Sequence, residues 1–298
     1  MRDAVTVVLV GIGGMGSVYV RALLDPRNRG KCRIAGAVDP APERCPQLRE
    51  IQDLGIPLFS SLEDFYEAYR ADLAIISSPI QFHSAQTCLA LSKESHVLCE
   101  KPAAGTIQEV REMTGARDAS KKRVAVGYQW SFSSSIQELK RDILAGAFGR
   151  PLRLKCLYLW PRDEAYFRRS DWAGKIRDPE GRWILDSPAN NAMAHDLHNM
   201  FYVLGGKIDE SAAPAWVEAE LCRAYPIENF DTAAMRCRTA DEVEILFYAS
   251  HASQIEKGPV FSYEFEKAAV HCASRASGIT AVWTDGGTKK YPPPDDEP

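Results

Sequence analysis

Residues 5–16 read VTVVLVGIGGMG, and this stretch decides the fold of the first half of the chain. A valine-rich run is followed by G-x-G-x-x-G and then by a helical pattern over residues 15–24, which predicts a strand, a tight turn and a helix. Gly11 allows the turn, Gly13 lets the backbone approach a pyrophosphate, and Gly16 lets the helix pack on the strand. We therefore predict that a dinucleotide binds at the helix N-terminus. The predicted loop contacts are Gly11, Ile12, Gly13, Gly14, Met15 and Gly16.

An acidic residue follows the second apolar run at the spacing that this motif requires. Asp39 lies 23 positions after Gly16. A carboxylate there accepts hydrogen bonds from a ribose diol and repels a 2′-phosphate, which favours NAD over NADP. Arg44 lies close enough in sequence to keep NADP open. A turn role for Asp39 before Pro40 is the alternative, and a flavin dinucleotide would also suit the loop.

The pattern along the chain predicts two domains. Apolar runs alternate with amphipathic stretches up to about residue 125, which indicates a doubly wound parallel sheet with crossover helices, the Rossmann α/β fold. Later runs follow one another with few helices between them, which predicts an α+β domain with an open antiparallel sheet. We expect a dinucleotide-binding domain at 1–127, a substrate and oligomerisation domain at 128–290, and a disordered tail at 291–298. Predicted helices of the second domain span residues 135–145 and 190–204.

Composition excludes several classes of protein. The 298 residues carry a net charge of −4, and the basic clusters at 121–123 and 168–169 are small, so nucleic acid is not an expected partner. No apolar run approaches the ~20 residues of a membrane helix, and no leader pattern precedes the first strand, so we expect a cytoplasmic protein. The eight cysteines contain no C-x-x-C pair. A resident metal is not expected, because H-x-x-H at His195 and His198 is a weak signal by itself.

Two further segments carry a family resemblance. Ser78-Pro79-Ile80-Gln81-Phe82-His83 follows one predicted strand, and Glu100-Lys101-Pro102 follows the next. With the glycine loop they resemble the glucose–fructose oxidoreductase, inositol dehydrogenase and rhizopine-catabolism (Gfo/Idh/MocA) family. The resemblance implies NAD or NADP as cofactor, hydride transfer at a hydroxyl or carbonyl of a sugar, sugar acid or cyclitol, and homo-oligomers built through the second sheet. The residues that it places around the cofactor are Ser78, Pro79, His83, Glu100, Lys101 and Gln129.

The resemblance also implies the catalytic residues. Lys101 would contact the substrate beside the nicotinamide, and His195 would accept the proton of the hydroxyl group. Many members read Asp-x-Gly-x-His where this chain has Asn191-Ala192-Met193-Ala194-His195. Four residues apart on a helix, Asn191 and His195 would share one face. The asparagine keeps a second hypothesis open, in which the protein is a catalytically silent NAD(H)-binding sensor.

The segment that follows the predicted strand at 152–160 is aromatic and basic. It contains three arginines, Arg162, Arg168 and Arg169, whose guanidinium groups are suited to a carboxylate or a phosphate. Aromatic faces also pack on the C–H surfaces of sugars, although packing within the protein is the simpler interpretation for most of these rings.

Overall fold

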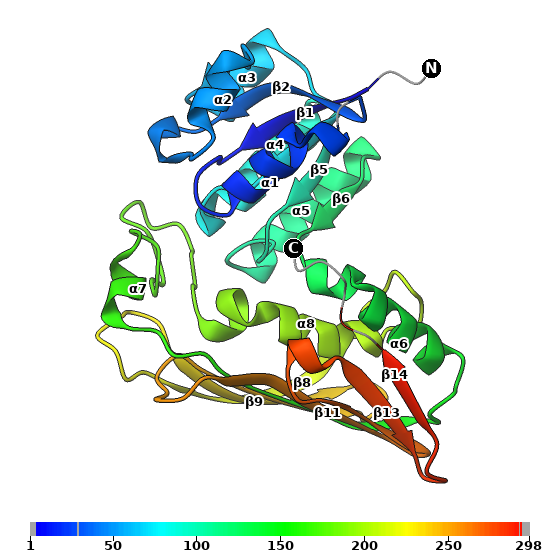
Figure 1. Ribbon diagram of the computed structural model, residues 1–298. Coiled ribbons are helices and arrows are strands. Elements are labelled where there is room, and N and C mark those ends of the chain that lie inside the picture. The colour runs from blue at the N-terminus through cyan, green and yellow to red at the C-terminus, as the bar shows by residue number, and fades with distance from the viewer. Residues whose placement is uncertain (1–3, 29, 292, 294–298) are drawn as a thin grey trace. The chain divides into compact units, whose positions relative to one another are not determined.

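The structure is a computed structural model that describes residues 4–28, 30–291 and 293. The chain divides into two compact units, and in Figure 1 the colour runs from blue to blue-green up to residue 127 and from green to red after it. The first comprises residues 1–127 together with Arg177–Ile184, and the second comprises Tyr128–Ile176 and residues 185–298. The return of Arg177–Ile184 to the first unit has no signal in the sequence. Arg182 lies over the Phe82 ring there, 4.5 Å from its centroid.

The first unit is the predicted Rossmann fold. Its six strands are all parallel and lie in the order β3-β2-β1-β4-β5-β6. The strands are β1 (Val5–Val10), β2 (Cys32–Val38), β3 (Leu58–Phe59), β4 (Leu73–Ile76), β5 (His96–Cys99) and β6 (Val124–Val126). The helices are α1 (Gly16–Leu24), α2 (Leu48–Asp53), α3 (Leu62–Ala68), α4 (His83–Ser92) and α5 (Ile107–Ser120), with 3₁₀ turns η1 (Pro26–Asn28), η2 (Pro42–Arg44) and η3 (Ile80–Phe82).

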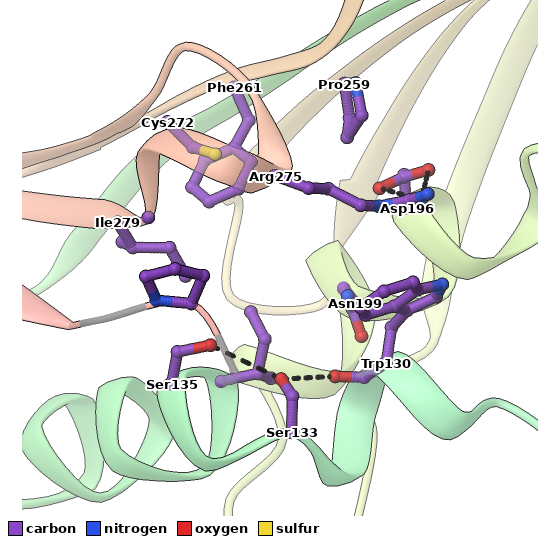
Figure 2. Close-up of a pocket in the computed structure, with 13 residues that line it drawn as sticks. Trp130, Ser133, Ser135, Asp196, Asn199, Pro259, Phe261, Cys272, Arg275 and Ile279 are labelled. Carbon is purple, nitrogen blue, oxygen red and sulfur yellow. Dashed lines mark hydrogen bonds and ion pairs between the residues drawn. The ribbon is translucent and has the colours of Figure 1, made fainter. Parts of the chain in front are cut away.

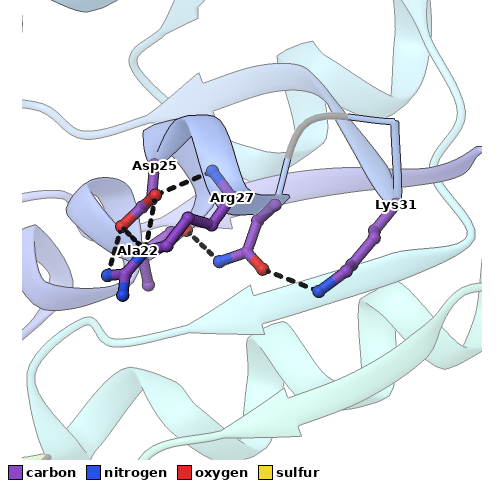
Figure 3. Close-up of polar contacts among 5 residues, drawn as sticks. Ala22, Asp25, Arg27 and Lys31 are labelled. Atoms are coloured by element: carbon purple, nitrogen blue, oxygen red, sulfur yellow. Dashed lines mark hydrogen bonds and ion pairs between the residues drawn. The ribbon is translucent and has the colours of Figure 1, made fainter.

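Local hydrogen bonds set where these helices begin and end. The Ser61 hydroxyl accepts a bond from the backbone N–H of Asp64 at 3.1 Å, and Thr106 forms a reciprocal capping box with Glu109 at the start of α5. After α1, the Asp25 carboxylate pairs with Arg27 at 2.7 Å in the turn that leads to β2 (Figure 3).

The second unit is built on one eight-stranded sheet, ordered β14-β13-β12-β11-β7-β10-β9-β8. All neighbours are antiparallel except β7 and β10, which are parallel because α7, η5, α8 and a meander of two strands separate them along the chain. The strands are β7 (Pro151–Leu159), β8 (Pro214–Cys222), β9 (Thr232–Thr239), β10 (Glu244–Ser250), β11 (Lys257–Phe265), β12 (Ala268–Cys272), β13 (Ile279–Trp283) and β14 (Thr288–Tyr291).

Helices cover one face of this sheet, as Figure 1 shows for α6 and α8. Phe247 and Tyr263 point into the core between sheet and helices, where Met200 of α8 is also fully buried. The other face carries ion pairs such as Arg153 with Glu244, and every residue of β8 is exposed. The helical elements are η4 (Gln129–Phe132), α6 (Ser134–Leu144), α7 (Glu164–Arg168), the π-helical turn η5 (Pro188–Ala192), α8 (Ala194–Val203) and η6 (Arg275–Ser277).

Two sequence-based expectations need correction in this unit. The helix predicted over 190–204 is two elements, because the Met193 N–H bonds back to the carbonyl of Pro188, five residues earlier, and α8 begins only at Ala194. Tyr291 does not belong to the predicted disordered tail, because it ends β14, is fully buried and donates a hydrogen bond to Asp142. Residues 292 and 294–298 of that predicted tail lie outside the described residues. Across the described ranges, no helix combines the length and the apolar character needed to cross a membrane.

We predict that Gly16→Ala destabilises the protein, whereas Gly115→Ala stabilises it slightly. A Cβ atom at Gly16 would lie 1.9 Å from the carbonyl oxygen of Gly11, so the backbone must shift, at a cost of at least about 1–3 kcal/mol. Gly115 lies in α5 with nothing within 4 Å of such an atom, so alanine gains about 0.5–1 kcal/mol. Thermal and urea unfolding measure both changes. Equal stability of the two variants would contradict the packing described here.

Candidate functional site

The glycine loop between β1 and α1 has the shape that the sequence pattern implies. Gly11 has φ +77°, and a Cβ atom there would lie 2.7 Å from the backbone nitrogen of Ser78. At Gly13 the nearest atom to an added Cβ is Cβ of Arg44 at 3.6 Å, an ordinary contact. Packing therefore requires glycine at position 11, whereas at position 13 it leaves the backbone open to close approach. This loop, leading into the N-terminus of α1, fits a dinucleotide pyrophosphate.

Asp39 is fixed beside the loop at the carboxyl end of β2. Its Oδ2 atom accepts a hydrogen bond from the backbone N–H of Ile12 at 2.9 Å, and its Oδ1 atom accepts one from Ala41 at 2.9 Å. The carboxylate thus has the turn role that the sequence left open, and it also lies where the ribose contact is predicted. Arg44, whose Cβ faces Gly13, is exposed.

His83 joins the loops that follow β4 and β5. Its ring is 1% exposed, with Nδ1 at 2.8 Å from the carbonyl oxygen of Pro102 and Nε2 at 2.8 Å from that of Ser78. Burial lowers the pKa of His83, so the neutral ring donates to one of these carbonyls. Both ring nitrogens face the protein interior. His83 therefore joins the two loops, and its contact with the cofactor stays a prediction.

Glu100 is likewise an internal anchor, and it precedes the half-buried Lys101. The Glu100 carboxylate is 5% exposed and accepts hydrogen bonds from the Tyr19 hydroxyl at 2.5 Å and from the Lys101 backbone N–H at 3.0 Å. Burial, followed by the bond to Glu100, raises the pKa of Tyr19. A Cβ atom at Gly127 would lie 2.9 Å from the Glu100 carboxylate, so a larger residue there would displace that carboxylate. The peptide bond between Lys101 and Pro102 is cis.

The remaining residues predicted around the cofactor lie on different elements. Ser78 donates a hydrogen bond to Gln86 at 2.5 Å, and Pro79 is exposed in the same loop. Ile12 is fully buried and offers only its backbone, while the Met15 side chain is 44% exposed. Gln129 belongs to the second unit, where it begins η4.

In the second unit, Asn191 is paired with a carboxylate that sequence reasoning missed. Its Nδ2 atom donates to Oδ1 of Asp186 at 2.7 Å, and Oδ2 of Asp186 accepts from the Gly174 N–H at 2.7 Å. Asp186 is 4% exposed and Asn191 is 9% exposed. The pair lies around the π-helical turn η5, a feature frequent at functional sites. No sequence motif pointed to Asp186, because the family pattern places its acid at 191.

His195 begins the first turn of α8 and is 7% exposed. Its ring meets Tyr128 edge-on, with centroids 5.8 Å apart, while His198 stacks on the same Tyr128 ring at 4.1 Å. Burial, with a smaller contribution from the charge of Lys140, lowers the pKa of His198 to about 4, so His198 is neutral near pH 7. Tyr128 therefore packs against both histidines of the helix.

A pocket in the same unit lies on the side of α8 that carries Asp196 (Figure 2). Asp196 is buried and pairs with Nη2 of Arg275 at 3.0 Å, and Arg275 lies over the Trp130 ring at 4.5 Å. Burial raises the pKa of Asp196, while the Arg275 charge acts to lower it. Neither His195 nor Asn191 lines this pocket.

Comparison with known proteins adds sequence and structural relatives. The model of an oxidoreductase family with an NAD-binding Rossmann fold, Gfo/Idh/MocA, matches residues 5–128. The rhizopine catabolism protein MocA of Rhizobium meliloti is 30% identical over 158 residues, 53% of this chain and 47% of that protein. An inositol 2-dehydrogenase of Rubrobacter xylanophilus is 25% identical over 70% of this chain and 54% of its own length. The chain thus spans about half the length of these curated relatives.

Solved structures share the fold over most of the chain. The WlbA dehydrogenase of Bordetella pertussis, solved with NADH and UDP-GlcNAcA, superposes with a TM-score of 0.78 at 22% identity, covering 90% of this chain and 79% of that one. An oxidoreductase of Agrobacterium radiobacter, solved with NAD+, L-tartaric acid and magnesium, gives 0.78 at 17% identity over 98% and 80%. At these identities the likeness concerns the fold alone.

The Asp186–Asn191 pair predicts a pH-dependent loss of stability in Asn191→Asp. The substitution places two carboxyl groups where an amide and a carboxylate now lie 2.7 Å apart, so one of them has a raised pKa in the folded state. The folded variant then holds a proton that the unfolded chain releases near pH 4. The stability loss relative to the wild type therefore grows with pH, by about 1.4 kcal/mol per pH unit, between the unfolded pKa and the raised folded pKa.

Urea unfolding between pH 5 and pH 8 measures this loss. The exchange variant Asp186→Asn/Asn191→Asp is the matched control, because it restores one carboxylate and one amide and recovers stability at pH 8. A loss that does not change with pH, or an exchange variant no better than Asn191→Asp, would contradict the pairing.

Proposed function

We propose that this chain is an NAD-dependent dehydrogenase of the Gfo/Idh/MocA family, because the model of that oxidoreductase family matches residues 5–128. It oxidises a CH–OH group of a sugar, sugar acid or cyclitol, or reduces the corresponding carbonyl group. The observation that carries this proposal is the placement of Lys101 on the same sheet edge as the glycine loop. The solved relatives that hold NADH or NAD+ support the choice of cofactor.

The sheet order explains why this edge is a ligand site. Strand β1 lies between β2 and β4. From β1 the chain adds β2 and β3 on one side, and it then crosses over to add β4, β5 and β6 on the other side. In doubly wound sheets, ligands bind outside the carboxyl ends of the strands at this switch point. The loops that follow β1, β4 and β5 carry Gly11, Ser78 and Lys101 respectively, and all three strands are parallel. The geometry of the first unit therefore supports a lysine held close to a bound nicotinamide.

The chain's own residues would manage charge and protons. The nicotinamide, when bound, supplies the hydride chemistry. Lys101 stabilises the alkoxide that develops on the substrate oxygen, and His195 accepts the hydroxyl proton. Asp186 orients the Asn191 amide through the 2.7 Å bond, so that Asn191 presents a fixed group to the substrate. Asp186 is then a positioning residue, and the catalytic residues are Lys101, His195 and Asn191.

The silent-sensor hypothesis rests on the missing aspartate at position 191. The second unit retains a buried carboxylate at the same turn, because Asp186 lies against Asn191. A carboxyl group thus lies one hydrogen bond away from position 191, although the residue there is an asparagine. This observation supports an active enzyme over a sensor.

We also propose a homo-oligomer and a cytoplasmic location. The face of the second sheet away from α6 and α8 exposes Tyr248 at 41%, and β8 exposes Trp216 at 45% and Leu221 at 52%, which suits contact with a second copy. All eight cysteines are free, which suits a reducing compartment. Size-exclusion chromatography with light scattering tests the oligomer directly.

We predict that the protein binds NAD at least about tenfold more tightly than NADP, because the fixed Asp39 carboxylate repels a 2′-phosphate. Asp39→Asn removes the charge but keeps an acceptor for Ile12, so the preference should shrink about tenfold. Calorimetric titration with both cofactors measures it. Asp53→Asn, on the exposed surface of α2, is the control. Tighter binding of NADP by the wild type would overturn the assignment of Asp39.

We predict that Lys101→Ala lowers kcat/KM by about 10²–10³ and leaves NAD affinity within a few-fold, because Lys101 stabilises charge that develops during the reaction. NADH absorbance with a panel of sugars, sugar acids and inositols measures turnover. Lys93→Ala, at the exposed end of α4, should match the wild type. Wild-type rates in Lys101→Ala would make Lys101 structural, and no NADH from any member of the panel would count against the proposed function.

A further inference from the structure

The chain that follows β7 forms a stack of alternating aromatic rings and guanidinium groups. Trp160 lies on Tyr158 with nearly parallel rings, whose centroids are 5.4 Å apart. The guanidinium carbon of Arg162 is 3.8 Å from the Trp160 ring and 4.6 Å from the Tyr166 ring. The guanidinium carbon of Arg169 lies 3.5 Å from the same Tyr166 ring. Two cations thus share one phenol ring, an arrangement that holds both guanidinium planes in place.

A carboxylate neutralises the neighbouring Arg168 but not these two arginines. Arg168 pairs with Glu164 on α7. Within the described part of the chain, neither Arg162 nor Arg169 forms an ion pair, and the Arg169 side chain donates to Tyr166, with its backbone oxygen at 2.6 Å. The Nε atom of Arg162 is buried and has no hydrogen-bond partner among the described residues. A buried donor without an acceptor costs free energy, and so does the repulsion between two neighbouring cations. A bound oxyanion would accept the hydrogen bond and offset the positive charge.

The histidine beside the stack does not add to its charge. His251 is 2% exposed, and its Nδ1 atom lies 2.8 Å from the carbonyl oxygen of Trp160. Burial, with a smaller contribution from the charge of Arg162, lowers the pKa of His251 to about 4, although the bond to Trp160 acts to raise it. The imidazole is therefore neutral near pH 7. The net positive charge of this cluster comes from the two arginines.

The arginine pair belongs to the same part of the second unit as the Asp186–Asn191 pair. Burial raises the pKa of the Tyr166 phenol, the Asp186 charge raises it, and the Arg169 charge lowers it. Asp186, which binds Asn191, is therefore close enough to Tyr166 to affect the pKa of its phenol, and Tyr166 is the ring over which both arginines lie. The Gly174 N–H, which follows α7 in the chain, also bonds directly to Asp186. An anion held by the arginines would lie beside the groups assigned above to the substrate.

We propose that Arg162 and Arg169 form a subsite for an oxyanion of the substrate, so that the enzyme acts on acidic sugars or sugar phosphates and not on neutral polyols. The planar fork of a guanidinium group matches carboxylate and phosphate oxygens in two-point contacts. Stacking on Trp160 and Tyr166 orients the forks in advance, which lowers the entropy lost on binding. This inference rests on the proposed function for the identity of the ligand as substrate.

Calorimetric titration of the NAD-loaded protein with D-glucuronate, D-glucose 6-phosphate and D-glucose tests the subsite. We expect at least one of the two anions to bind at least about tenfold more tightly than D-glucose, and the better anion distinguishes carboxylate from phosphate. R162Q and R169Q should each weaken that anion about 10–100-fold and leave D-glucose unchanged. R162K, which keeps the charge, should recover part of the affinity and guards against misfolding of R162Q. R168Q is the matched control, since Arg168 is exposed and paired, and it should bind as the wild type does.

Two results would overturn the subsite. One is equal anion affinity in R162Q, R169Q and R168Q, and the other is wild-type binding of D-glucose as tight as that of both anions. NADH formation separates this inference from the proposed function. Anion binding that is lost in R162Q, without turnover of any substrate, would leave the subsite standing and count against the dehydrogenase. Turnover of neutral sugars that is unchanged in both arginine variants would support the dehydrogenase and reject the subsite.

Discussion

The first unit depends on a backbone contact between the loop after β1 and the loop after β4. Gly11 lies so close to Ser78 that a single added carbon would come within 2.7 Å of its nitrogen. His83 then joins the Ser78 carbonyl to the Pro102 carbonyl, and Asp39 holds the Ile12 amide. The loops after β1, β2, β4 and β5 are therefore linked to one another, and the edge where the dinucleotide is proposed to bind is preorganised before any ligand arrives.

Buried charge organises the second unit in a comparable way. A carboxylate taken out of water must find partners, and two of them do so near α8. Asp186 is held by Asn191 and the Gly174 amide, while Asp196 is held by Arg275 in the pocket of Figure 2. These partnerships distinguish the two carboxylates: Asp186 is bound to Asn191 of the turn η5, and the charge of Asp196 is compensated by Arg275. Arg162 and Arg169 are the opposite case, because these two cations have no carboxylate partner. Their uncompensated positive charge is the reason for proposing an anionic ligand.

The two units divide the proposed work between them. The first carries the features that fit a cofactor, and these are mostly backbone: glycines, amides and the carbonyls that His83 joins. The second carries side chains with charge and hydrogen-bonding capacity, which suit a substrate with many polar groups. Backbone features tolerate little change, since Gly11 and Gly16 have no space for a Cβ atom. Side-chain features allow more change, because an amide at Asn191 and a carboxylate at Asp186 meet in one hydrogen bond whose two groups could stand at either position.

Sequence by itself determined the features that depend on neighbours along the chain. The spacing of Gly11, Gly13 and Gly16 after a valine-rich run predicted the strand, turn and helix of the first unit, because one strand–turn–helix element contains the whole motif. The position of Asp39 at the end of β2 followed for the same reason. Tertiary structure alone decided the rest. The Asp186–Asn191 pair depends on a π-helical turn that interrupts the expected helix, and the two-residue strand β3 is too short to leave a pattern. The cluster of Arg162, Tyr166 and Arg169 forms only through stacking contacts in the folded chain, because residue spacing encodes local geometry alone. The net charge of such a site depends on every charged group packed around it, and these groups come from distant parts of the sequence.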